Sequence, residues 1–162
     1  MNDQKVNHAP LDMREHLERL EAKGLLTRID EPVNKDTQLH PLVRWQFVGG
    51  LAETERRAFM FTNVFGADGR KFETPVVVGV FAANPEIYAV GMGASVENIG
   101  DVWNRGIAVP IEPVQVDNPP CQEVVIKGED LRKPGGGLAS LPIPISSPGF
   151  DSAPYLTATL CV

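Results

Sequence analysis

The first third of the chain alternates apolar and polar residues with the period of a helix and then of a strand. Four positions at helical spacing form one face: Met13, His16, Leu17 and Leu20. Asp12 precedes them as an N-cap, with Glu15 closing a capping box, and Gly24 follows as a stop. The pattern therefore predicts a helix over residues 13–23 and then a short strand over residues 25–30.

Further elements follow up to residue 104. Asp36 or Thr37 is the expected cap of a second helix, which the pair Gly49-Gly50 ends. A strand is predicted over 58–64, and a turn follows at 66–69. The β-branched run 75–81 predicts a central strand that is buried on both faces. Two more helices are expected, one opening at Asn84-Pro85-Glu86 and one over 96–104.

The second half is richer in turns, since nine of the 14 prolines lie between Pro110 and Pro154. Short strands are predicted at 114–116 and 123–127, and an extended but not central segment at 141–145. A last strand, 155–162, reaches the final residue without a terminator, which suggests a fragment, a proteolysed species or one piece of a split protein.

Length and composition narrow the class of protein. A chain of 162 residues with 43% hydrophobic residues fits one domain, or one domain and the opening of a second. The net charge of −6, without a basic stripe, argues against nucleic-acid binding. No apolar run is long enough to span a membrane and no secretory leader is visible, so we expect a cytoplasmic protein. Cys121 and Cys161 fit two inert, partly buried thiols in a reducing compartment.

No constellation of catalytic or metal-ligating residues stands out. His8, His16 and His40 are far apart in sequence and are interpreted as surface or interface residues. The glycine-rich stretches 91–95 and 135–137 lack the context of a phosphate loop and are interpreted as a helix terminus and a flexible loop. Asp151, in a Gly/Pro-rich loop, is expected to stabilise a turn.

Several motifs in order resemble the N-terminal part of the UbiD-family decarboxylases. The helix and strand of residues 11–33 are similar to the family's opening and its "I-x-x-P-V" exit. The later motifs resemble the family's "F-x-N-V-x-G", "P-V-x-x-N", "P-x-Q-E-V", "L-P-x-P", "H-P-G-D" and "P-Y-I-T" segments. In this chain they begin at Phe61, Pro75, Pro120, Leu141, Ser147 and Pro154. The resemblance extends over residues 11–162. Three departures leave the substrate open: Ser147 replaces the histidine of "H-P-G-D", Phe150 is inserted before Asp151, and residues 135–137 lengthen the preceding loop.

The resemblance implies a mixed α/β (α+β) fold, with a mixed sheet and flanking helices in residues 11–138 after a disordered tail at 1–10. Residues 139–162 would be a linker and the first strand of a split β-barrel that binds flavin. Full-length members bind prenylated FMN with a divalent metal (Mn) and K, and reversibly decarboxylate an aromatic or α,β-unsaturated acid. Their catalytic and metal-binding residues match positions after Val162. Only Thr157, of "Y-I-T", would lie near the cofactor, and residues 1–162 alone would bind none.

The resemblance leaves two possible functions for the chain. In the first, the chain is the N-terminal scaffold of such a decarboxylase, acting on a small carboxylic acid as part of a homo-oligomer. In the second, it is a free-standing, non-catalytic assembly or binding subunit that completes a separate catalytic chain. A strand edge left open at 155–162 would pair with another chain, so we expect self-association of the isolated protein.

Overall fold

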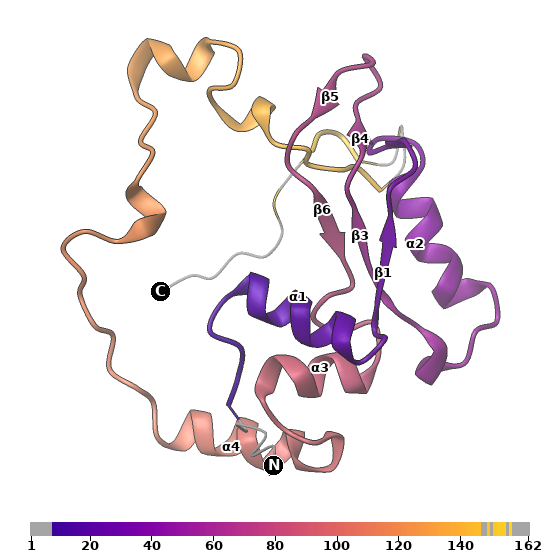
Figure 1. Cartoon of the computed structure of the whole chain (residues 1–162), viewed down its shortest axis with the longest axis vertical. Helices are drawn as coiled ribbons and strands as arrows, with labels where there is room; N and C mark the ends of the chain where they lie inside the picture. Colours follow the sequence, from indigo (N-terminus) through magenta and orange to yellow (C-terminus); the bar gives the residue numbers. More distant parts are fainter. Residues whose placement is uncertain (1–7, 147–148, 150, 155, 157–162) are drawn as a thin grey trace.

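A three-stranded sheet in the order β1-β3-β6 forms the centre of the fold (Figure 1). The computed structural model describes residues 8–146, 149, 151–154 and 156. The α-helices are α1 (Met13–Ala22), α2 (Leu39–Val48), α3 (Pro85–Met92) and α4 (Ile99–Ala108). The strands are β1 (Leu26–Ile29), β2 (Val33–Asn34), β3 (Ala58–Phe61), β4 (Val64–Phe65), β5 (Lys71–Phe72) and β6 (Val76–Val78). The expected mixed α+β class is confirmed.

The central sheet is mixed, and a second small sheet continues it. β1 and β3 run parallel, with Leu26 opposite Ala58, while β3 and β6 run antiparallel. The second sheet has the order β2-β4-β5, with β2 parallel to β4 and β4 antiparallel to β5. The chain passes from one sheet to the other at Thr62 and Asn63, so the strand predicted over 58–64 is in fact two strands.

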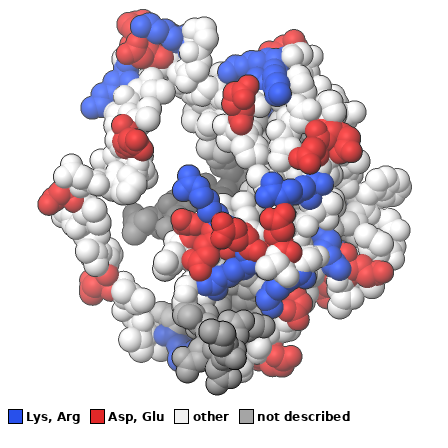
Figure 2. Space-filling model, viewed as in Figure 1, with Lys and Arg blue, Asp and Glu red and all other residues white. Residues whose placement is uncertain are grey.

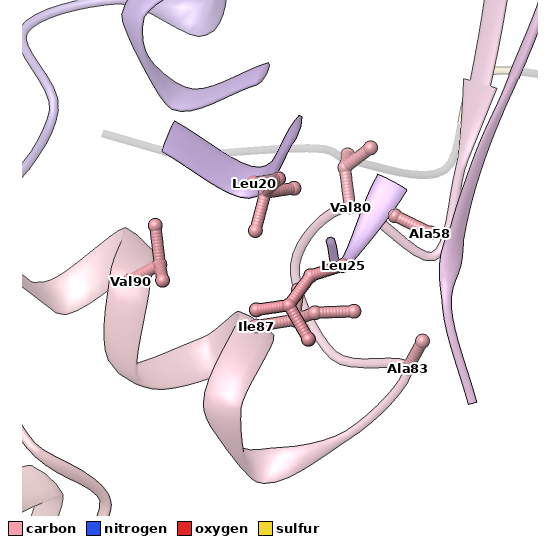
Figure 3. Packing of buried hydrophobic residues seen from close by; sticks show 7 residues of the cluster. All are labelled: Leu20, Leu25, Ala58, Val80, Ala83, Ile87 and Val90. Atoms are coloured by element: carbon pink, nitrogen blue, oxygen red, sulfur yellow. The ribbon is translucent and has the colours of Figure 1, made fainter. Parts of the chain in front are cut away.

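The two faces of the central sheet contribute to separate hydrophobic cores. Neighbouring residues of a strand point to opposite faces, so Ala58 and Phe59 of β3 join different clusters. One cluster joins the sheet to α1 and α3 and comprises Leu20, Leu25, Ala58, Val80, Ala83, Ile87 and Val90 (Figure 3). The other joins it to α2 and comprises Val33, Leu39, Val43, Phe61, Val64 and Phe72. The sheet therefore lies between helices on both sides.

The ends of α1 and α3 are formed by capping residues that can be recognised in the sequence. Asp12 caps α1, because its Oδ1 accepts a hydrogen bond from the Glu15 backbone N–H at 2.9 Å. The Glu15 carboxylate accepts from the Leu11 N–H at 2.7 Å, one residue before the expected partner of a capping box. Gly24 ends the helix with φ +66°. Asn84 caps α3 in the same way as Asp12 caps α1, accepting from the Ile87 N–H at 2.9 Å.

The predicted cap of α2 is wrong. Gln38 is the N-cap residue and makes no side-chain capping bond. Asp36 instead pairs with the Lys35 ammonium at 2.5 Å and accepts from the Ala67 backbone N–H at 3.0 Å. The Asn34 side chain binds the backbone N–H groups of both Asp36 and Thr37, which turns the chain before the helix begins. The long-range contact with Ala67 is what draws Asp36 away from the helix.

The prediction that the valine run is a central strand is also wrong. Among the described strands, β6 pairs with β3 alone and lies at the edge of its sheet, and its three valines are half-buried. Val77 nevertheless packs against one core and Val76 and Val78 against the other. The run is apolar because both faces of β6 are covered by other residues. The pattern of side chains along a strand indicates which of its faces are buried, but not how many strands are hydrogen-bonded to it.

Beyond α3 the chain moves away from the sheets (Figure 1). The 3-10 helix Val96–Asn98 and α4 confirm the helix predicted over 96–104. Residues 109–136 are exposed almost throughout and contain the 3-10 helices Pro120–Gln122 and Gly128–Arg132. The strands predicted at 114–116 and 123–127 are absent from this described segment. None of the strands in the described ranges lies beside these residues to complete a ladder.

Candidate functional site

An apolar groove of about 820 Å³ runs along β6 and is the first candidate site. One wall is the stretch 74–83, which includes all of β6, and the other is the extended segment 141–144. His40 and Phe47, from α2, also line the groove. The groove lies here because β6 is at the edge of its sheet. Segment 141–144 covers this edge, beside which no other described strand pairs.

The polar end of the groove is formed by a turn. The Asp151 carboxylate accepts a hydrogen bond from the Ser146 backbone N–H, and both residues line the groove. This agrees with the turn-stabilising role predicted for Asp151. His40 is half-buried and is the imidazole in the groove wall. A groove of this kind suits apolar side chains or an apolar ligand, with few polar atoms to orient a reacting group.

A second hollow, of about 830 Å³, lies beside the β4–β5 hairpin and contains charged residues. Two cations lie over the Phe72 ring, with Lys35 Nζ 5.8 Å and the Arg70 guanidinium 4.9 Å from its centroid. Lys35 is paired with Asp36, and Arg70 Nη1 donates to the Ala139 carbonyl oxygen at 3.0 Å. These contacts tie the segment near 139 to the hairpin.

The described residues do not fit a flavin phosphate or a metal ion. The groove along β6 contains no lysine or arginine to meet a phosphate. In the second hollow, Lys35 is paired with Asp36, the Arg70 guanidinium donates to the Ala139 carbonyl oxygen, and Asp68 adds a further carboxylate to the lining. Across the described ranges, no three His, Cys, Asp or Glu side chains lie close enough to hold a metal. On the face shown in Figure 2, basic and acidic side chains are interspersed.

The three histidines do not meet, and for one of them the sequence prediction is wrong. His8 and His40 are half-buried and belong to separate regions. His16 is buried, with 3% of its surface exposed, and its Nε2 lies 2.6 Å from the Val80 carbonyl oxygen. It occupies the apolar face of α1, one turn before Leu20. The helical spacing of those two residues was the available signal, because a histidine on the buried stripe must itself be buried.

The remaining sequence candidates fall into two groups. Gly91–Ser95 ends α3, and Gly93 is the left-handed C-cap with φ +60°, as expected of a helix terminus. Gly135 and Gly137 lie in a turn, in agreement with the predicted loop. Cys121 is an exposed free thiol, so its predicted partial burial is wrong: it lies in the exposed segment 109–136. The second group lies outside the described residues: Thr157, Cys161 and most of the strand predicted over 155–162.

Glu15 and Glu21, whose carboxyl pKa values are lowered, lie at the surface and do not line the groove along β6. The Leu11 backbone N–H and the Arg19 guanidinium lower the pKa of Glu15. The Arg28 guanidinium likewise lowers the pKa of Glu21, and that pairing raises the pKa of Arg28. Both are ion pairs that stabilise local structure. Neither marks a proton donor or acceptor for catalysis.

The fold can now be compared with known families. None of the helices in the described part of the chain has the length and apolarity needed to cross a membrane. The family model for the 3-octaprenyl-4-hydroxybenzoate carboxy-lyase N-terminal domain matches residues 17–104. That match covers more than half of the 162 residues and includes every described strand of both sheets. The order of motifs and the match agree: the chain belongs to the UbiD family, and residues 17–104 lie in the N-terminal domain that its decarboxylases carry.

Proposed function

We propose that this chain is the N-terminal scaffold of a UbiD-like decarboxylase and that it contributes structure rather than catalytic groups. The observation that carries the proposal is the family match over 17–104, together with the apolar lining of the groove along β6. A surface with few polar atoms is suited to packing against another domain. The domain's task is then to support the part of the enzyme that binds cofactor and substrate.

The substrate and cofactor of the whole enzyme follow from the family resemblance. The reaction is the reversible decarboxylation of an aromatic or α,β-unsaturated carboxylic acid. Prenylated FMN, held with Mn and K by residues outside this chain, supplies the electron sink. Within the chain, residues 11–138 form the N-terminal domain and 139–162 lead into the flavin-binding barrel. The Thr157 hydroxyl is a hydrogen-bond donor at the edge of that site. The enzyme works as a cytoplasmic homo-oligomer.

The experiment compares residues 1–162 with the protein isolated from its native source. An antibody to these residues first gives the intact mass of the native species. Both proteins are then supplied with prenylated FMN, Mn and K, and CO₂ release is measured with a panel of aromatic and unsaturated acids. We expect a native species several times heavier than 17.6 kDa that releases CO₂, and a short chain that takes up no flavin and turns over no acid.

Two results would contradict the proposal. Decarboxylation by residues 1–162 alone would place catalytic groups in the chain. A native species of 17.6 kDa would favour the second function, a free-standing assembly subunit. In that case, co-purification with a separate chain carrying the catalytic residues is the expected finding.

A further inference from the structure

A third cavity, of about 310 Å³, lies between α1 and α3 and has features of a small-molecule site. Its walls include Met13 and His16 from α1, Tyr88 and Met92 from α3, and Phe81, which follows β6. An engineered protein cavity of about 150 Å³ holds a benzene molecule, so this space accommodates one or two aromatic rings. Aromatic rings and thioethers are the side chains that pack best against such a ligand.

His16 gives this cavity a specific hydrogen-bonding property. Its Nε2 lies 2.6 Å from the Val80 carbonyl oxygen, and a carbonyl oxygen can only accept, so Nε2 carries the proton. In the uncharged imidazole Nδ1 is then an acceptor. Nδ1 is buried and has no hydrogen-bond partner among the described residues. A buried acceptor without a donor is unfavourable, and a ligand that brings an O–H or N–H removes that penalty.

We propose that this cavity binds an uncharged aromatic molecule that carries one O–H or N–H donor, with His16 Nδ1 as the acceptor. The Asp12 carboxylate lines the same cavity and disfavours an anionic ligand by charge repulsion. Phe81 stacks on the imidazole at 5.8 Å between ring centroids and is 56% exposed. Phe81 therefore forms a solvent-facing wall of the cavity. The site is separate from decarboxylation and stands whether or not the proposed function does.

The lining residues provide their own reporters and variants. Met13 and Met92 line the cavity, whereas Met60 on β3 does not, so methionine methyl signals separate local binding from general effects. Gly91 also lines the cavity, and a Cβ there would lie 3.5 Å from His16 Cε1, an ordinary contact. Gly91→Leu therefore fills the space. A Cβ at Gly106 in α4 would meet no neighbouring side chain of the described residues within 4 Å, so Gly106→Leu is the matched control.

The test is a titration of the complete natural protein, labelled with ¹³C at the methionine methyl groups, with phenol and with anisole. The two probes share a ring, but anisole has no donor. We expect saturable shifts at Met13 and Met92 and none at Met60. Anisole should bind roughly fivefold more weakly than phenol, the effect of one lost hydrogen bond. Gly91→Leu should abolish the shifts, whereas Gly106→Leu should leave them unchanged.

Three outcomes would overturn the proposal. Equal binding of phenol and anisole would mean that His16 does not select a donor. Linear, unsaturable shifts would mean that the cavity holds only water. Unchanged phenol binding by Gly91→Leu would place the ligand elsewhere. If Gly91→Leu does not fold, the comparison of phenol with anisole on the unaltered protein still decides the question.

Discussion

The packing of α1 against the sheet can be tested by replacing Leu20 with alanine. Leu20 is fully buried in the cluster that joins α1, α3 and β3 (Figure 3). The substitution removes three carbon atoms, and at about 0.8 kcal/mol for each buried methylene the transfer term is about 2.4 kcal/mol. The unfilled space adds a cavity term, so the free energy of unfolding should fall by about 3–4 kcal/mol.

The assay is urea unfolding followed by circular dichroism, with Leu42→Ala as the control. Leu42 lies on α2 and is 44% exposed, so the same change there should lower the free energy of unfolding by only about 1.3 kcal/mol, the buried share of the transfer term. In a thermal melt, Leu20→Ala should lower the Tm by roughly 6–16 °C for a domain of this size. Equal losses for the two variants would refute the packing of α1 described above.

Three further predictions concern local features, at Asp12, Gly79 and Glu15. Asp12→Ala should lower the free energy of unfolding by about 1 kcal/mol through loss of the α1 cap, whereas Asp12→Asn, which keeps an acceptor, should be close to neutral in the same urea assay. Gly79→Ala should destabilise by about 1–3 kcal/mol in thermal melts, because φ is +74° and the new Cβ would lie 3.2 Å from Ala83 Cβ. Gly69→Ala, with φ +80° and open space around it, should lose less, and equal losses would contradict the contact at Gly79. The pKa of Glu15 is lowered in the folded state, so its ionised carboxylate contributes to the free energy of unfolding. This contribution is complete above the ordinary glutamate pKa of about 4.3 and is lost as the pH falls through the lower pKa of the folded state. Glu15→Gln should therefore weaken the pH dependence of unfolding in that acidic window, and an unchanged acid profile would rule out the contribution.

The helix boundaries were largely predictable because their causes are local. Asp12 and Asn84 each bind a backbone N–H three residues along the chain, and Gly24 adopts a left-handed φ. These interactions need no partner from elsewhere in the fold. Asp36 was misassigned because its partner, the Ala67 N–H, is 31 residues away, and nothing near Asp36 in sequence indicates that contact.

The candidate sites were less predictable than the fold. The groove along β6 arises because segment 141–144 returns to a sheet edge, and the cavity beside His16 arises because α1 packs against α3. Each needs two segments that lie more than 50 residues apart in the chain. The family motifs predicted that the chain belongs to the UbiD family and has a mixed α+β fold, but they did not predict the groove or the cavity.

The position of each α-helix, the mixed α+β fold class and the membership of the UbiD family can all be predicted from the amino-acid sequence. Hydrophobic period, capping residues and ordered motifs are properties of neighbouring positions. The edge position of β6 among the described strands and the burial of His16 against Val80 depend instead on contacts between distant segments. Only the tertiary structure decided that residues 114–116 and 123–127 form no strands. Strand order and burial depend on which distant segment supplies a hydrogen-bond or packing partner, and a pattern of local residues does not specify that partner.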